Sequence, residues 1–335
     1  MAHGAIMSSS VPSPSPGPSE KVPPAVPTAQ DWMLLGLITV LGASGFAGIK
    51  VSVETAPPSI VAAGRIWVGA ALLYLYMKAT GRKLPPLKEQ GGGWSPLWGF
   101  AAAVGVASYT FPMFVIPVAQ LSVSSLLAGI YMAFMPIATV VLAALFADEP
   151  LTRQKLAGAI IGTLGVIFLI GPMGLQGIFT QSVFAQLLLI LGATGYAVGS
   201  VITRRAPEAP ARSFATMMML TAGLAATPLA LMDLRQLGEV SITSWLGIIY
   251  LGVVPTGMTS IMIILVVRRV GAGFMALCNY LIPIMAIIYG VVLFGETLAW
   301  RYAIGLCTIL VGIALVQPGS AKGLLQSLRQ IIGKA

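Results

Sequence analysis

The chain contains very little charge. Only 9% of its 335 residues are Asp, Glu, Lys or Arg, whereas an ordinary soluble protein carries roughly 25%. Hydrophobic residues make up 57% of the chain, and the mean hydropathy is +0.92. Because so few charges cannot cover the surface of a soluble protein of this length, most of the chain must be surrounded by lipid.

Residue types that carry out catalysis or bind metals are also scarce. The two cysteines, Cys278 and Cys307, both lie in apolar runs, which excludes a disulfide framework. The one histidine is His3. Paired aspartates, a serine–histidine combination and an H-E-x-x-H motif are all absent, so we expect no enzyme, no cofactor and no metal. The phosphate-binding motif G-x-x-x-x-G-K-S/T is missing too, so this chain does not hydrolyse ATP.

Long apolar runs dominate the sequence. A bilayer core about 30 Å thick requires roughly 20 apolar residues per helix. A membrane β-barrel would instead show short alternating segments. The sequence therefore predicts an all-α polytopic membrane protein with about ten transmembrane helices. The runs are 32–52, 58–79, 95–117, 121–146, 154–171, 183–203, 213–232, 243–267, 272–295 and 300–317.

The two ends of the chain differ from the apolar runs. Residues 1–30 are rich in proline and serine and show no helical period, which is typical of a disordered tail. Residues 318–335 place leucines and isoleucines at helical spacing among basic residues. This pattern predicts a short amphipathic helix on the membrane surface, with a frayed solvated tail as the alternative.

The basic residues indicate the orientation in the membrane. With the N-terminus inside, 15 of the 19 Lys and Arg residues fall in inside segments and only Lys50, Arg235 and Arg301 fall outside. Arg65 lies within a span. We therefore expect a bacterial inner-membrane protein whose two termini are both cytoplasmic. Since the basic residues are scattered between apolar runs, the net charge of +9 does not indicate a nucleic-acid partner.

The chain contains an internal repeat. LGASGFAGIKV at 41–51 matches LGATGYAVGSV at 191–201. Five further residues recur at a constant separation of 147. They are Pro136, Glu149, Leu151, Gly158 and Gly165, matched by Pro283, Glu296, Leu298, Gly305 and Gly312. Each half, 31–172 and 173–317, then holds five helices, so the second half must enter the membrane inverted. Inverted repeats usually build one site between them near the midplane.

These features resemble the EamA family of the drug/metabolite transporter superfamily over about 31–317. The motifs that carry the resemblance are GASGFAGIK, AAGRIWVGAALL, SSLLAGIYMAFMPIATVVLAALFADEPLT and PIMAIIYGVVLFGETL. Members often carry a tryptophan just before the small-residue run, where this chain has Leu41-Gly42. The resemblance implies two inverted five-helix repeats that form a secondary transporter of small metabolites working by alternating access.

The expected substrates follow from this resemblance. We expect export of amino acids or related compounds across the cytoplasmic membrane. Import of a vitamin or nucleoside-like metabolite, a lipid or drug flippase, and a channel are the alternatives. The expected partners are a small-molecule metabolite and membrane lipid, without nucleic acid, for a monomer or homodimer.

The resemblance implies a cavity lined by the first, third, fourth, sixth, eighth and ninth helices. Polar, aromatic and flexible side chains on these helices suit a small amphipathic substrate. Asn279, near the middle of a span, needs hydrogen-bond partners from a substrate or a neighbouring helix. The candidate substrate-binding residues are Ser44, Tyr109, Tyr131, Met132, Tyr196, Asn279 and Tyr280.

Arg65 is a further candidate because it is the one charge clearly inside a span. Burying an arginine in a membrane costs at least roughly 2.5 kcal/mol, so it needs a partner. It either binds a carboxylate or phosphate of the substrate, or anchors to helix-end carbonyls or Glu54 and extends to the outer interface.

The acidic residues all lie in tails, loops or helix ends. This placement favours facilitated diffusion or exchange over proton coupling, with coupling through Glu149 and Glu296 as the alternative. We expect these two glutamates to cap the N-termini of the fifth and tenth helices, which carry positive partial charge.

Overall fold

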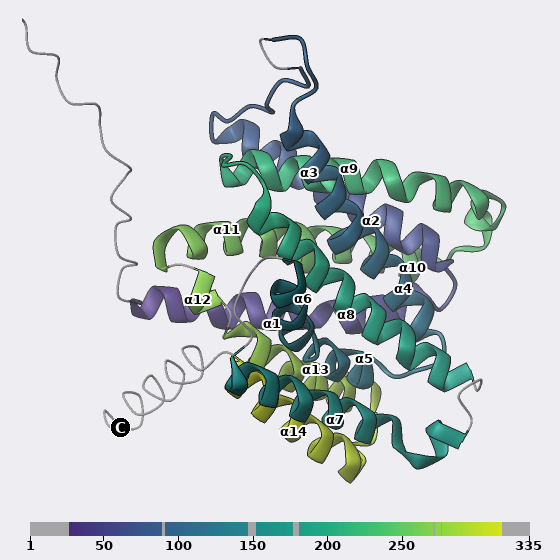
Figure 1. Cartoon of the computed structure of the whole chain (residues 1–335). Helices are drawn as coiled ribbons and strands as arrows, with labels where there is room; N and C mark the ends of the chain where they lie inside the picture. The colour runs from purple at the N-terminus through teal and green to yellow at the C-terminus, as the bar shows by residue number, and fades with distance from the viewer. Residues whose placement is uncertain are drawn as a thin grey trace, which may run out of the picture.

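The computed structural model describes residues 27–88, 91–146, 152–176, 181–270, 272–275 and 277–316. The predicted C-terminal helix, Glu149 and nearly all of the predicted N-terminal tail lie outside these residues. The elements of the described ranges are helical (Figure 1). In chain order they are α1 Ala29–Ser52, α2 Pro58–Ala79, α3 Pro96–Gly105, η1 Val106–Thr110, α4 Phe111–Gln120, α5 Ser125–Met132, α6 Met135–Phe146, α7 Arg153–Gln176, α8 Gln181–Arg205, α9 Ala211–Met232, η2 Leu234–Glu239, α10 Ile242–Leu251, η3 Gly252–Met258, α11 Thr259–Val270, α12 Ala272–Met275, α13 Cys278–Phe294 and α14 Trp300–Val316.

Seven helical stretches of the described chain are long and apolar enough to cross a bilayer. They are Ala29–Ser52, Pro58–Ala79, Pro96–Gln120, Ser125–Phe146, Val183–Arg205, Ala211–Met232 and Ile242–Val266. Two shorter apolar helices, Leu281–Phe294 and Trp300–Leu315, follow them, and α7 contains the predicted span 154–171. The chain is therefore a multi-pass, all-helical membrane protein, while the count of ten spans stays a prediction.

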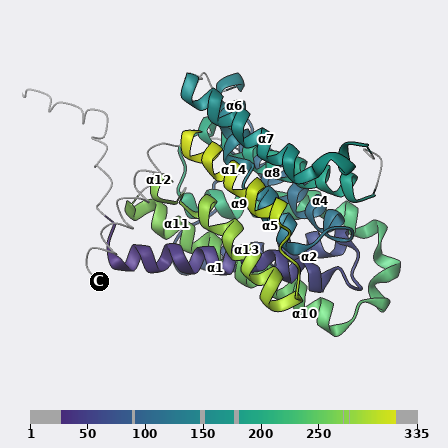
Figure 2. The ribbon, with the colours of Figure 1, turned by 90° about the horizontal axis from the view of Figure 1, so that it is seen from below.

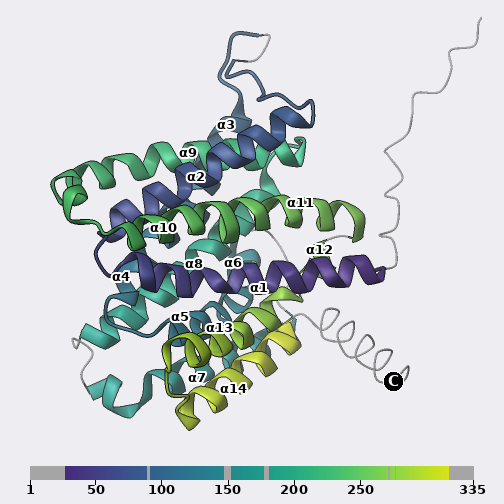
Figure 3. The same ribbon diagram turned by 180° about the vertical axis from the view of Figure 1, so that it is seen from behind.

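The helices pack in pairs that join segments far apart in the sequence. α2 lies along α9, and α7 lies along α14. Between these two pairs, α1 crosses the middle of the molecule, where it contacts α10 and α13 (Figure 3). α8 contacts α4 and α6. The view from below shows α7 beside α14 (Figure 2).

Glycines permit the close contact between α7 and α14. A Cβ atom placed on Gly312 would lie 2.7 Å from the Gly158 carbonyl oxygen and 2.7 Å from the Gly162 nitrogen. Because lipid tails are as apolar as leucine, membrane helices associate through such close packing. A side chain at Gly312 would therefore push α14 away from α7.

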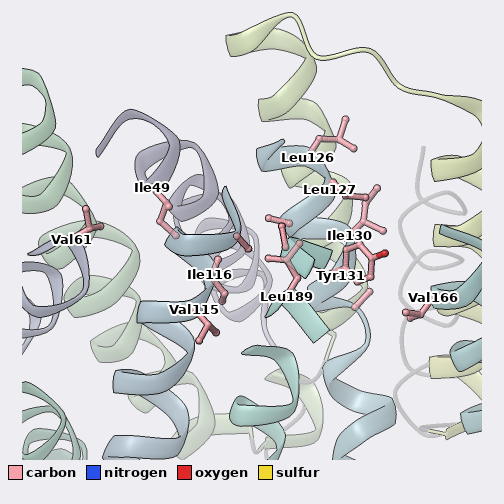
Figure 4. Close-up of a cluster of buried hydrophobic side chains, with 14 of the residues drawn as sticks. Ile49, Val61, Val115, Ile116, Leu126, Leu127, Ile130, Tyr131, Val166 and Leu189 are labelled. Carbon is pink, nitrogen blue, oxygen red and sulfur yellow. The ribbon is translucent and has the colours of Figure 1, made fainter. Parts of the chain in front are cut away.

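The largest buried cluster joins both halves of the chain. Leu126, Ile130 and Tyr131 of α5 contact a group that includes Ile116 of α4 and Leu189 of α8 (Figure 4). These side chains are almost fully buried. Their interdigitation fixes α5 against α8 beside the helix crossings in the middle of the molecule.

Glu296, in the loop between α13 and α14, contacts the start of α5. Its Oε1 atom accepts hydrogen bonds from Lys50 Nζ at 2.8 Å, Ser125 Oγ at 3.0 Å and the Ser125 backbone N–H at 3.1 Å. Its Oε2 atom accepts one from the Leu126 N–H at 2.9 Å. The first N–H groups of a helix lack acceptors within the helix and carry positive partial charge, so they bind a carboxylate well.

The prediction that Glu296 caps the tenth helix is therefore wrong, because its carboxylate caps α5 instead. Gly295 adopts a left-handed conformation with φ 61° and ends α13 just before this glutamate. Glu296 thus ties three elements together, namely the end of α1, the start of α5 and the α13–α14 loop. Glu149 lies outside the described residues.

The same contacts shift the ionisation of Glu296. Burial by itself raises the pKa of a carboxyl group, but the hydrogen bonds from Lys50, Leu126 and Ser125 outweigh it and hold the pKa of Glu296 below its ordinary value of 4.5. A lowered pKa in the folded state means that the ionised form stabilises the fold at higher pH. This contribution is lost as the pH falls below 4.5 and through the lowered pKa.

We expect Glu296→Gln to lower the free energy of unfolding by about 1.5–3 kcal/mol at neutral pH, since hydrogen bonds to a charged group are lost. Thermal unfolding in detergent, followed from pH 8 to pH 3, checks this. The difference in thermal stability between wild type and variant should become smaller below pH 4.5. The control is Glu239→Gln, because Glu239 is exposed. A difference in thermal stability that stays constant across the acid range would contradict the lowered pKa of Glu296.

Candidate functional site

A cavity of about 380 Å³ lies where the helices of the two halves meet. Its lining comes from α1, α2, η1, α4, α5, α6, α8, η3, α11, α12 and α13. The volume falls within the usual range of small-molecule sites. The lining residues are Ile38, Gly42, Gly45, Phe46, Ile49, Arg65, Tyr109, Met113, Ile116, Met132, Met135, Tyr196, Pro255, Thr256, Thr259, Ser260, Ile263, Met275, Cys278, Ile282 and Pro283.

Two irregular helical turns shape this cavity. The segments η1 and η3 are π-helical and sit inside Pro96–Gln120 and Ile242–Val266, two spans that contain proline. Pro112 directly follows η1, and Pro255 lies within η3. Proline lacks an N–H group and so removes one helical hydrogen bond, and a π-helical turn absorbs the local change in geometry. Tyr109 and Thr256 lie on these turns and reach the cavity.

Four of the predicted site residues line this cavity together. They are Arg65, Tyr109, Met132 and Tyr196. Asn279 and Tyr280 belong to α13, and their side chains lie outside the described part of the structure. The roles of all these residues in substrate binding stay predictions.

Ser44 and Tyr131 point elsewhere. Ser44 is hydrogen-bonded to the Tyr250 hydroxyl at 2.6 Å, beside a separate groove between α1, α10 and α13. Tyr131 is fully buried and donates a hydrogen bond to Gln186 Oε1 at 2.6 Å. Since neighbouring residues on a helix point about 100° apart, Met132 faces the cavity while Tyr131 faces α8.

The sequence interpretation did not identify Thr256, Thr259 and Ser260 as site residues, although all three line the cavity. The signal available in the sequence was a group of three hydroxyl residues that follows Pro255 within one span. Met258, in the same segment, is 42% exposed and does not line this cavity.

Arg65 is held inside the cavity wall. Its side chain is 8% exposed, and its Nε–H donates a hydrogen bond to Thr256 Oγ1 at 2.8 Å. A Cβ atom placed on Gly45 would lie 3.8 Å from Nη2 of Arg65, so the guanidinium lies beside α1 at this glycine. The side chain therefore faces the protein interior, and the alternative of an anchor at the outer interface is wrong.

The lining carries a single charge among the residues that the structure describes, that of Arg65. Tyr196 is close enough to interact with it electrostatically. The described residues contain no cluster of three His, Cys, Asp or Glu side chains that could hold a metal ion.

Known proteins match this chain over most of its length. YedA of Escherichia coli K12, named an uncharacterized inner membrane transporter, is 26% identical over 85% of this chain and 90% of its own length. YddG of Ancylobacter novellus, named an aromatic amino acid exporter, is 26% identical over 84% of this chain and 95% of its own. One solved crystal structure shares the fold, with a TM-score of 0.61 and 20% identity over 87% of this chain and 99% of the other.

The model of the EamA-like transporter family matches the chain twice, at residues 30–171 and again at 183–317. The two matches together cover most of the sequence outside the tails. The chain therefore belongs to the EamA-like transporter family.

Proposed function

We propose that this transporter moves a small organic metabolite across the cytoplasmic membrane by alternating access, and that it exports amino acids or related compounds. The observation that carries the proposal is a cavity lined by residues from both stretches of the chain that match the family model. Residues from Ile38 to Met135 line it from the first match, and residues from Tyr196 to Pro283 line it from the second. A site between two repeats is the arrangement that alternating access requires.

The helix contacts support an inverted pair of repeats. Several of the main helix contacts are preserved when each helix is exchanged for its counterpart in the other half. α1 contacts α13, and correspondingly α8 contacts α6. α2 with α9, and α7 with α14, are pairs of counterparts that contact each other. The π-helical turns also fall in corresponding spans.

The name of one relative supports the substrate class. YddG of Ancylobacter novellus is named an aromatic amino acid exporter, and the cavity here offers apolar and aromatic side chains around one cation. Among the described lining residues there is no Asp, Glu or His, which favours exchange or facilitated diffusion over proton coupling.

Flux through reconstituted liposomes tests the carrier function. We expect saturable uptake of labelled phenylalanine, accelerated by unlabelled phenylalanine inside the vesicles, because one site serves both directions. Non-saturating flux would indicate a channel. Movement of labelled lipid without amino-acid flux would indicate a flippase.

Two neighbouring residues of α5 provide a matched pair of variants. Met132→Trp places a larger side chain in the cavity, so we expect at least a tenfold loss of flux with normal thermal stability. Tyr131→Phe removes the hydrogen bond to Gln186 outside the cavity. We expect it to lower the free energy of unfolding by about 1 kcal/mol while flux is retained. The opposite pattern would place the cavity outside the transport path.

Labelling of single cysteines tests the inversion and the orientation. In a chain with Cys278→Ser and Cys307→Ser, the exposed residues Glu54 and Glu208 are replaced one at a time by cysteine. Glu54 follows the first span and Glu208 follows the sixth, so inverted halves place them on opposite sides. A membrane-impermeant maleimide should label Glu54→Cys in intact cells, and Glu208→Cys only after permeabilisation. Equal labelling of both in intact cells would rule out inversion.

A further inference from the structure

Arg65 has unused hydrogen-bonding capacity inside the cavity. A guanidinium has five N–H donors. Among the described residues, the one hydrogen bond that Arg65 makes runs from Nε to Thr256, so the four N–H groups on its two terminal nitrogens lack protein acceptors there. A charged side chain that is more than nine-tenths buried carries a large desolvation cost unless it is paired. The missing acceptors therefore point to a ligand.

The geometry of Arg65 suits a carboxylate. The hydrogen bond from Nε to Thr256 holds the planar guanidinium in one orientation. The two terminal nitrogens remain available. Two parallel N–H groups bind the two oxygens of a carboxylate in a bidentate manner. Tyr109 and Tyr196 line the same cavity, and a tyrosine hydroxyl can donate a further hydrogen bond to an anion.

The rest of the cavity lining suits the apolar part of a ligand. Phe46, Met113, Ile116 and Ile282, from helices of both halves, supply apolar surface. Flexible methionines adapt to ligands of different shape. An acid with an aromatic or branched aliphatic tail would thus bury its tail here while its carboxylate lies at Arg65.

An ammonium group finds no matching charge. Acidic side chains are absent from the described lining. Glu296 is bound to Lys50 and the start of α5, and Asp31 is bound to Thr28 and Arg269. The amino group of a zwitterion would lose its hydration in the cavity without gaining a counter-ion, which is costly.

From these contacts we propose that the substrates are monoanionic carboxylic acids with an apolar body, bound by Arg65, and that they are preferred over zwitterionic amino acids. This inference rests on the proposed carrier function and narrows its preferred substrates to amino-acid relatives whose amino group is absent or blocked, with zwitterions such as phenylalanine as weaker substrates. Arg65 is then the residue that selects the charge of the substrate.

Binding to the purified full chain in detergent tests the proposal separately from transport. The probes are 3-phenylpropionate, L-phenylalanine and phenethylamine, which share one apolar body and differ in charge. At pH 7 we expect 3-phenylpropionate to bind at least about tenfold more tightly than phenylalanine, and phenethylamine to bind most weakly. Equal affinities, or tighter binding of the zwitterion, would overturn the proposal.

Variants then assign the preference to Arg65. Arg65→Gln should abolish the advantage of 3-phenylpropionate, and Arg65→Lys should restore part of it. Arg235→Gln, at an exposed position of η2, is the matched control and should leave the order unchanged. If Arg65→Gln does not fold, Thr256→Val serves instead, since it removes only the acceptor of Nε and should weaken binding of the anion severalfold. An undiminished anion preference in folded Arg65→Gln, or unchanged anion binding in Thr256→Val if Arg65→Gln does not fold, would overturn the role of Arg65.

The two proposals fail in different ways. Binding with anion preference but no saturable flux in liposomes would reject the carrier function and leave the site intact. Saturable flux with equal affinity for all three probes would reject the anion site and leave the carrier function intact.

Discussion

A charge among membrane helices must find its partners within the protein or in a ligand, because lipid tails offer neither hydrogen bonds nor counter-charge. Glu296 meets this requirement entirely with protein groups, since Lys50, Ser125 and Leu126 supply four hydrogen bonds. Arg65 meets it only in part within the described chain, where its one hydrogen bond is to Thr256. The first group therefore has a structural role, whereas the second leaves donors that a substrate can use.

Small residues and prolines shape the cavity that Arg65 faces and the packing of the helices around it. Gly45 lies beside the Arg65 guanidinium, and the π-helical turns η1 and η3 bring Tyr109 and Thr256 to the cavity. On the outer side of the bundle, Gly158, Gly162 and Gly312 bring α7 and α14 together. Packing at the periphery and a cavity at the centre thus depend on the same property, the close approach of backbones.

Glu296 and two neighbouring residues of α5 show where sequence reasoning stops. Glu296 was expected to cap the helix that follows it, but the start of α5 is the helix end that it binds. Tyr131 and Met132 looked equally suitable for a cavity, yet only Met132 reaches it. Both distinctions depend on contacts with residues more than 50 positions away, from Tyr131 to Gln186 and from Glu296 to Leu126.

The sequence by itself determined the membrane environment and the positions of the helices, such as 58–79 for α2, because a span needs a long uninterrupted apolar run. It also indicated Arg65 as a special residue, since an isolated charge in such a run is costly. Only the tertiary structure decided which face of each helix meets the cavity. Spans that are apolar all round carry no polar stripe to mark an inner face, so their orientation is set by packing against neighbouring helices.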